Sequence, residues 1–83
     1  TLNRKEMVMS QDPLQLFGQH VRELRLANKI SQEELAAITE LDRTYISGIE
    51  RGKRNLSLKN ILKVAKALRV SPSELLNISG FSS

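Results

Sequence analysis

This 83-residue sequence is short of reactive and metal-binding side chains, with no cysteine, no tryptophan and only one histidine. Without cysteine the chain can form neither a disulfide framework nor a thiolate metal site. It also lacks a glycine-rich phosphate loop, a nucleophile elbow and a cluster of metal-ligand residues. We therefore expect a protein that is not an enzyme and that binds no metal or other cofactor.

Long apolar runs and secretion signals are also missing. No apolar stretch approaches the ~20 residues that a helix needs to cross a bilayer, and the start of the chain shows no secretory pattern. We therefore expect no membrane partner and a cytoplasmic location. The length corresponds to one small domain, whose marginal core would gain stability from oligomerisation.

Charge is distributed unevenly along the chain. The net charge is only +4, which by itself says little about partners. Residues 30–41, however, contain three glutamates and no basic residue, whereas residues 43–55 contain four basic residues and one glutamate. This local concentration of positive charge is what a protein needs to bind DNA.

Apolar periodicity and helix-capping signals predict five short helices and no strand, so the expected fold class is all-α. Residues 1–12 lack periodicity and are predicted to be a flexible N-terminal arm; residues 13–78 form the predicted domain and residues 79–83 a tail. The fourth helix is expected to run from a cap at Ser57 to about Arg69. Its apolar face is predicted to consist of Leu58, Ile61, Leu62, Ala65 and Leu68.

The segment Ser31–Asn55 carries the clearest motif. Ser31 and Glu34 have the spacing of a capping box, which predicts the start of a helix. Asp42 is a suitable cap for a second helix. Only three residues, 39–41, separate that cap from the last apolar position of the first helix. The short connection is typical of a helix-turn-helix, whose second helix can enter the major groove of DNA.

On a helical wheel of about 100° per residue, the second helix, Arg43–Arg51, places Ile46 and Ile49 toward the core. The outer face contains Thr44, Ser47, Gly48 and Arg51, with Arg43 and Tyr45 at its flank. Most such faces are simply solvated, but this one carries no exposed carboxylate. Gly48 costs about 1 kcal/mol against alanine within a helix, and close approach to another backbone would explain its presence.

Residues 17–76 resemble the Cro/CI-type, or Xre, helix-turn-helix family. More narrowly, the chain is similar to the controller proteins of bacterial restriction–modification systems in the stretch LDRTYISGIERGKRN. This resemblance implies a five-helix, lambda-repressor-like bundle over residues 13–78 that serves for DNA binding and dimerisation. It also implies a sequence-specific transcription regulator that binds a palindromic operator as a homodimer. The alternatives are a phage repressor or Cro-like regulator, and an antitoxin-type protein whose main partner is a protein.

The resemblance also implies roles for individual residues. Gln32 occupies the position of a glutamine that binds a DNA phosphate, and the Arg-Thr-Tyr-x-Ser run begins the recognition helix. Arg25 and Glu50 are expected to form a structural ion pair. The predicted DNA-binding residues are Gln32, Arg43, Thr44, Tyr45, Ser47, Arg51, Lys53, Arg54 and Asn55.

A homodimer interface is predicted at the C-terminal end, because one short helix cannot hide every apolar residue there. The predicted interface residues are Leu75, Leu76, Ile78 and Phe81. The alternative is that Leu75 and Leu76 close the core of the monomer while Phe81 stays in solvent. One dimer or two adjacent dimers could occupy the operator, and RNA polymerase is a further candidate partner. Such a regulator would be bacterial or phage-encoded and would lie with the nucleoid.

Overall fold

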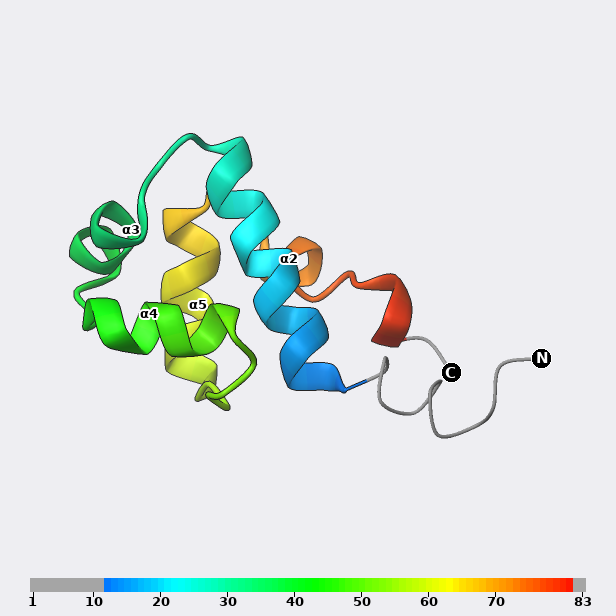
Figure 1. Ribbon diagram of the computed structural model, residues 1–83. Helices are drawn as coiled ribbons and strands as arrows, with labels where there is room; N and C mark the ends of the chain where they lie inside the picture. Colours follow the sequence, from blue (N-terminus) through cyan, green and yellow to red (C-terminus); the bar gives the residue numbers. More distant parts are fainter. Residues whose placement is uncertain (1–11, 82–83) are drawn as a thin grey trace.

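The computed structural model describes residues 12–81, which contain five α-helices, one 3₁₀ turn and no strand (Figure 1). The elements are α2 (Pro13–Ala27), α3 (Gln32–Thr39), α4 (Arg43–Glu50), α5 (Leu58–Ala67), α6 (Pro72–Leu75) and η1 (Ser79–Phe81). The predicted all-α class with five helices is therefore confirmed. The arm predicted over residues 1–12 lies outside the described residues, except for Asp12.

Each α-helix begins at a side-chain cap that accepts a hydrogen bond from the first turn, which satisfies a backbone amide lacking a partner within the helix. The caps are Asp12, Ser31, Asp42, Ser57 and Ser71, in chain order. Ser31 and Ser71 form reciprocal capping boxes with Glu34 and Glu74, as their spacing predicts. Asp12, which the sequence assigned to the arm, instead belongs to the domain because it caps α2.

The helices α2, α3, α4 and α5 end alike. After each, one residue takes a left-handed conformation, and the next amide donates to a carbonyl five residues earlier, as in a Schellman motif. The left-handed residues are Lys29 (φ 60°), Glu40 (φ 60°), Gly52 (φ 75°) and Arg69 (φ 61°). Glycine adopts this conformation readily, whereas lysine, glutamate and arginine rarely do.

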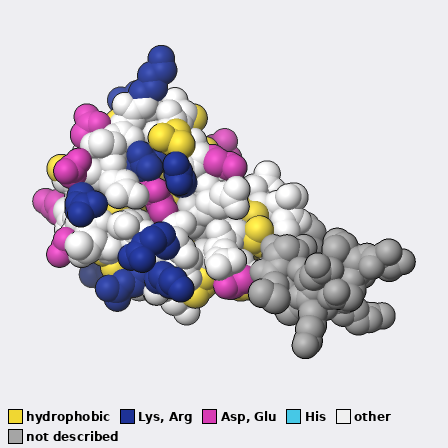
Figure 2. Space-filling view, in the orientation of Figure 1, with side chains coloured by type: hydrophobic (Ala, Val, Ile, Leu, Met, Phe, Trp, Pro, Cys, Tyr) yellow, Lys and Arg dark blue, Asp and Glu magenta, His cyan; other side chains and the backbone are white. Residues whose placement is uncertain are grey.

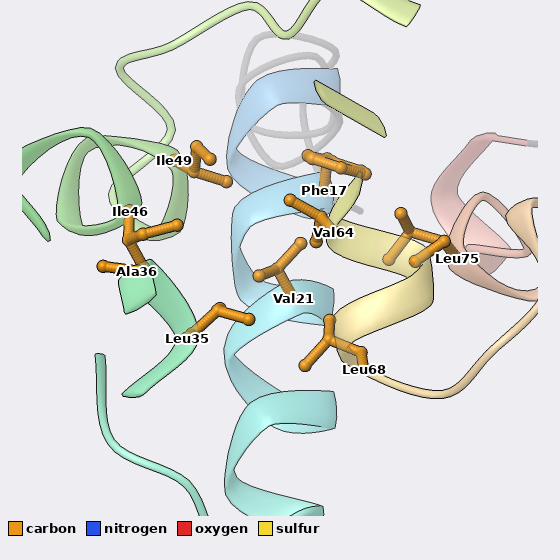
Figure 3. Packing of buried hydrophobic residues seen from close by; sticks show 10 residues of the cluster. Phe17, Val21, Leu35, Ala36, Ile46, Ile49, Val64, Leu68 and Leu75 are labelled. Atoms are coloured by element: carbon orange, nitrogen blue, oxygen red, sulfur yellow. The ribbon is translucent and has the colours of Figure 1, made fainter. Parts of the chain in front are cut away.

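The core lies where all five α-helices meet (Figure 3). Its buried apolar residues are Phe17, Val21, Leu35, Ala36, Ile46, Ile49, Val64, Ala65, Leu68 and Leu75. Within this core, α2 packs against α4 at Gly18. A β-carbon at Gly18 would lie 2.2 Å from the carbonyl oxygen of Ile49. Glycine is therefore what allows α2 to approach the end of α4 so closely.

Two expectations about the C-terminal half are wrong. Leu75 is completely buried, so it closes the core of the single chain and cannot form a dimer interface. Leu58 and Leu62 leave 72% and 46% of their surface exposed. They lie on one margin of α5, away from the arc of Val64 and Leu68 that faces the core, and the expected face did not include Val64, which is completely buried.

The chain remains ordered beyond the predicted domain end at residue 78. Residues 79–81, expected to be part of a tail, form η1, which packs against α2. Phe81 nevertheless leaves 41% of its surface exposed. The helix α5 ends at Ala67, two residues earlier than expected, because its Schellman motif places Arg69 in the left-handed region.

Candidate nucleic-acid interface

The helices α3 and α4 form the predicted helix-turn-helix. Between them Glu40 adopts the left-handed conformation, and the Leu41 amide donates to the carbonyl of Ala36 at 3.0 Å. Ile46 and Ile49 bury α4 against the core, being 0% and 1% exposed. The opposite side of α4 therefore faces outward.

Positive charge gathers on this outward side. In Figure 2, Lys and Arg side chains lie over α4 and the loop after it, whereas carboxylates lie along the edge formed by α3. The four basic residues of this region, Arg43, Arg51, Lys53 and Arg54, are all exposed. Exposed cations at one surface attract the phosphates of DNA.

A buried ion pair fixes α4 to α2. Arg25 Nε donates to Glu50 Oε2 at 2.6 Å, and Arg25 Nη2 donates to Glu50 Oε1 at 3.1 Å. The two side chains are only 10% and 4% exposed. Arg25 Nη1 also donates to the carbonyl of Ile30 at 2.9 Å, which ties the pair to the loop before α3. The ion pair implied by the resemblance is thus present.

The carboxylate of Glu50 stabilises the positive charge of the Arg25 guanidinium. The hydrogen bond with Glu50 raises the pKa of Arg25 above its usual value, against the opposing effect of burial. Two parallel N–H to carboxylate bonds are strong and directional. They set the position of the C-terminal end of α4 relative to α2.

Hydrogen bonds continue from this pair to the surface. Gln32 Nε2 donates to Glu50 Oε1 at 3.1 Å. Arg43 Nη1 lies 3.5 Å from Gln32 Oε1, a long hydrogen bond. Gln32 and Arg43 are the first residues of α3 and α4. The side chains that begin the two helices are therefore linked to the buried carboxylate behind them.

Tyr45 has partners on two sides. Its hydroxyl oxygen accepts from Asn60 Nδ2 at 3.2 Å, which connects α4 to α5. The guanidinium carbon of Arg54 lies 5.4 Å from the centre of the ring, within the range of a cation–π interaction. Asn60 was missed by sequence reasoning, because nothing in its position on α5 distinguishes it from a solvated polar residue.

The helical wheel placed Gly48 on the outer face of α4, but in the structure this residue is not open to solvent. It is buried, and a β-carbon there would lie 2.9 Å from Arg54 Cγ. The close neighbour is therefore a side chain of this chain's own loop. The Lys53 amide also donates to the Gly48 carbonyl at 2.8 Å, which holds the start of the loop against α4.

The nine predicted DNA-binding residues lie on the first turn of α3, on α4 and on the loop after it. Hydrogen bonds or stacking bring Gln32 to Arg43 and Tyr45 to Arg54. Arg51 Nε reaches only the carbonyl of Ser47, at 3.4 Å. Within residues 12–81, no three His, Cys, Asp or Glu residues could hold a metal ion. No helix in that range is long and apolar enough to cross a membrane.

A second exposed surface lies at the C-terminal side. Leu58, Leu62, Leu76 and Phe81 are each at least 41% exposed. We call Leu76 and Phe81, which line one hollow, the C-terminal apolar surface. Leu58 and Leu62 are one helical turn apart on α5 and therefore neighbours. Leu76 and Phe81 line one apolar hollow together with Leu56 and Ile61. Ile78, the remaining predicted interface residue, is only partly exposed and packs against the core.

Comparison with known proteins shows the same architecture elsewhere. The helix-turn-helix family model matches residues 21–75. The chain is 57% identical over 65 residues to Control protein C.BamHI of Bacillus amyloliquefaciens, covering 77% of this chain and 80% of that protein. The restriction–modification controller protein C.AhdI from Aeromonas hydrophila, known from a crystal structure, is 58% identical with a TM-score of 0.73. That match covers 75% of this chain and 94% of C.AhdI.

A third similar protein is seen with DNA. The controller protein C.Esp1396I, crystallised as a tetramer in complex with its natural 35 base-pair operator, is 41% identical to this chain. The TM-score is 0.70, and the match covers 76% of this chain and 83% of the other. These likenesses confirm the predicted helix-turn-helix fold.

Proposed function

Since the chain belongs to the helix-turn-helix family of restriction–modification control proteins, we propose that it binds a palindromic operator and regulates restriction–modification genes. This is a family of transcription regulators without a catalytic role. The observation that carries the proposal is the basic outer side of α4, which the buried Arg25–Glu50 pair fixes in place. We further propose that the protein acts in the bacterial cytoplasm and that RNA polymerase is the partner through which it changes transcription.

We assign base reading to the exposed start of α4. Arg43 is the candidate for guanine, because an arginine fork matches the O6 and N7 acceptors in the major groove. Thr44, Tyr45 and Ser47 lie on the same helix and supply hydroxyls. Gln32, Arg51, Lys53, Arg54 and Asn55 surround this region and are proposed to contact mainly phosphates, which position the protein without reading sequence.

Binding to operator variants tests the role of Arg43. Arg43→Ala should remove preference at one base pair in each half-site, worth about 1–3 kcal/mol of discrimination. Lys63→Ala, which removes an exposed cation from α5, is the matched control and should leave the preference intact. Equal loss of affinity for operator and random DNA would show that Arg43 contacts only a phosphate.

We also propose that two copies associate through the C-terminal apolar surface. Leu76 and Phe81 are each 41% exposed and line one apolar hollow, and a two-fold dimer would cover them with the same surface of a second copy. The recognition helices would then read half-sites about 34 Å apart. Because C.Esp1396I forms a tetramer on its operator, we propose that two such dimers can occupy adjacent sites.

Sedimentation combined with DNA binding tests the dimer. Leu76→Asp should weaken self-association and operator binding together while leaving helix content unchanged, because Leu76 is exposed in the single chain. Leu26→Asp is the matched control, since Leu26 is 52% exposed on α2, outside this surface. A protein that remains monomeric at high micromolar concentration and still binds a palindrome tightly would contradict the proposal.

A further inference from the structure

Gly48 leaves a space on α4 that the side chain of Arg54 fills. A β-carbon at Gly48 would lie 2.9 Å from Arg54 Cγ, 3.4 Å from its Nε and 3.7 Å from its Cδ. The stem of Arg54 therefore crosses α4 directly over the glycine. Beyond it, the guanidinium reaches the ring of Tyr45, with 5.4 Å between the guanidinium carbon and the ring centre.

The backbone gives no other reason for a glycine at this position. Among the described glycines only Gly52 has a positive φ, so Gly48 has an ordinary helical conformation that alanine would adopt. Alanine is also the better helix former. What glycine alone provides here is the space above its α-carbon.

We propose that Gly48 is a positioning residue for Arg54: its missing side chain lets this loop arginine lie across the outer side of α4 and present its guanidinium beside Tyr45 for DNA. This inference rests on the proposed function and refines it. Arg54 then meets a phosphate from a position fixed against the recognition helix, whereas a loop arginine extending away from α4 would have no fixed position when DNA arrives.

Two further contacts keep the arrangement in place. The amide of Lys53 donates to the Gly48 carbonyl at 2.8 Å, so the residue before Arg54 is fixed to α4. Asn60 Nδ2 donates to the Tyr45 hydroxyl at 3.2 Å, so the ring that receives the guanidinium is held from α5. The cation–π contact with this fixed ring already restricts the Arg54 side chain. Less conformational entropy is therefore lost when Arg54 binds DNA.

A double-mutant cycle on operator binding tests whether Gly48 acts through Arg54. Gly48→Ala should lower operator affinity about tenfold, the size expected when one charge-assisted contact is misplaced. In an Arg54→Ala background the same change should alter affinity less than about twofold, because the arginine it displaces is already absent. Additive effects would overturn the proposal, since they would mean that the new methyl group disturbs DNA directly.

The fold should survive this substitution. The neighbour of the added methyl group is a flexible exposed side chain, which can swing away. Gly48→Ala should therefore melt at the same temperature as the wild type or higher. A clearly lower melting temperature would mean that the methyl group meets something rigid, which contradicts the proposed role.

A measurement without DNA separates this inference from the proposed function. The Arg54 guanidinium lies over the ring of Tyr45, so an upfield ring-current shift of the Arg54 side-chain protons by NMR that depends on Tyr45 would report this contact. Gly48→Ala and Tyr45→Leu should both abolish this shift, whereas Ser47→Ala should retain it. Unchanged Arg54 shifts in Gly48→Ala would overturn the positioning role even if operator binding is confirmed. Failure of the wild type to bind operator would overturn the proposed function, leaving the placement of Arg54 to be judged by NMR.

Discussion

The inner and outer sides of α4 differ in what an added methyl group would meet. On the inner side, a β-carbon at Gly18 of α2 would lie 2.2 Å from the carbonyl oxygen of Ile49 and 2.8 Å from that of Glu50. On the outer side, the three atoms nearest to a β-carbon at Gly48 would all belong to the side chain of Arg54. Backbone carbonyls in a packed helix cannot move aside, whereas an exposed arginine can.

The two sides of α4 therefore have different roles. The inner side sets the position of the recognition helix, and the outer side carries the side chains that face DNA. The inner side combines buried isoleucines, backbone contact and a bidentate ion pair, so the axis of α4 is fixed before DNA arrives. The outer side consists of side chains that hold one another through weaker contacts, such as the 3.5 Å bond between Arg43 and Gln32. A fixed axis with adaptable side chains lets the same helix adjust to bases without losing its orientation.

Removing the buried carboxylate should have the largest effect on the inner side. Glu50→Ala leaves the guanidinium of Arg25, a residue only 8% exposed, without its partner, which costs about 3–5 kcal/mol. For a domain of this size the melting temperature should fall by more than about 10 °C, measured by circular dichroism. Glu33→Ala, which removes an exposed carboxylate from α3, is the control. If both variants melt within error of the wild type, the pair does not fix α4.

Gly18→Ala should have the next largest effect and sharpens the comparison with Gly48. The methyl group would overlap two carbonyl oxygens, and overpacking of this kind costs about 1–3 kcal/mol. Denaturant unfolding should show a lower midpoint for Gly18→Ala than for Gly48→Ala, although both changes improve helix propensity by about 1 kcal/mol. Equal midpoints for the two variants would remove the distinction between a rigid and an adaptable side.

The sequence predicts the inner side better than the outer side. Apolar spacing identifies Ile46 and Ile49 as core residues, and the capping box at Ser31 places a helix start correctly, because these signals are local. It does not predict that Arg54 folds back over Gly48, since that depends on the path of a loop.

The sequence also does not predict which apolar residues are buried when several compete for the same core. Leu75 and Leu76 are adjacent and alike, yet only the three-dimensional packing decides that Leu75 is completely buried and Leu76 is 41% exposed. The same holds for α5, where Leu58 and Leu68 belong to one apolar face on the wheel but only Leu68 enters the core. Assigning a residue to a dimer interface therefore needs the folded chain.

Gln32 connects the two sides, so its loss should affect binding more than stability. Gln32→Ala removes the bond to Glu50 and the contact with Arg43, but leaves the buried pair intact. We expect operator affinity to fall about fivefold to tenfold, the size of one hydrogen bond of about 1 kcal/mol or slightly more. The melting temperature should shift by less than it does in Gly18→Ala. A large loss of stability with unchanged affinity would place Gln32 on the inner side instead.

The smallest effect should come from Lys53, whose side chain belongs entirely to the outer side. Lys53 is exposed and uses only its backbone amide to hold the loop, so Lys53→Ala should leave the melting temperature unchanged. If its ammonium neutralises one phosphate, the slope of log affinity against log salt should become less steep by about 0.9, equally for operator and random DNA. Lys66→Ala, on α5, removes the same charge away from α4 and should leave the slope unchanged. Equal slopes for Lys53→Ala and the wild type would exclude Lys53 from the DNA contact. The DNA-contacting residues of this loop would then begin at Arg54.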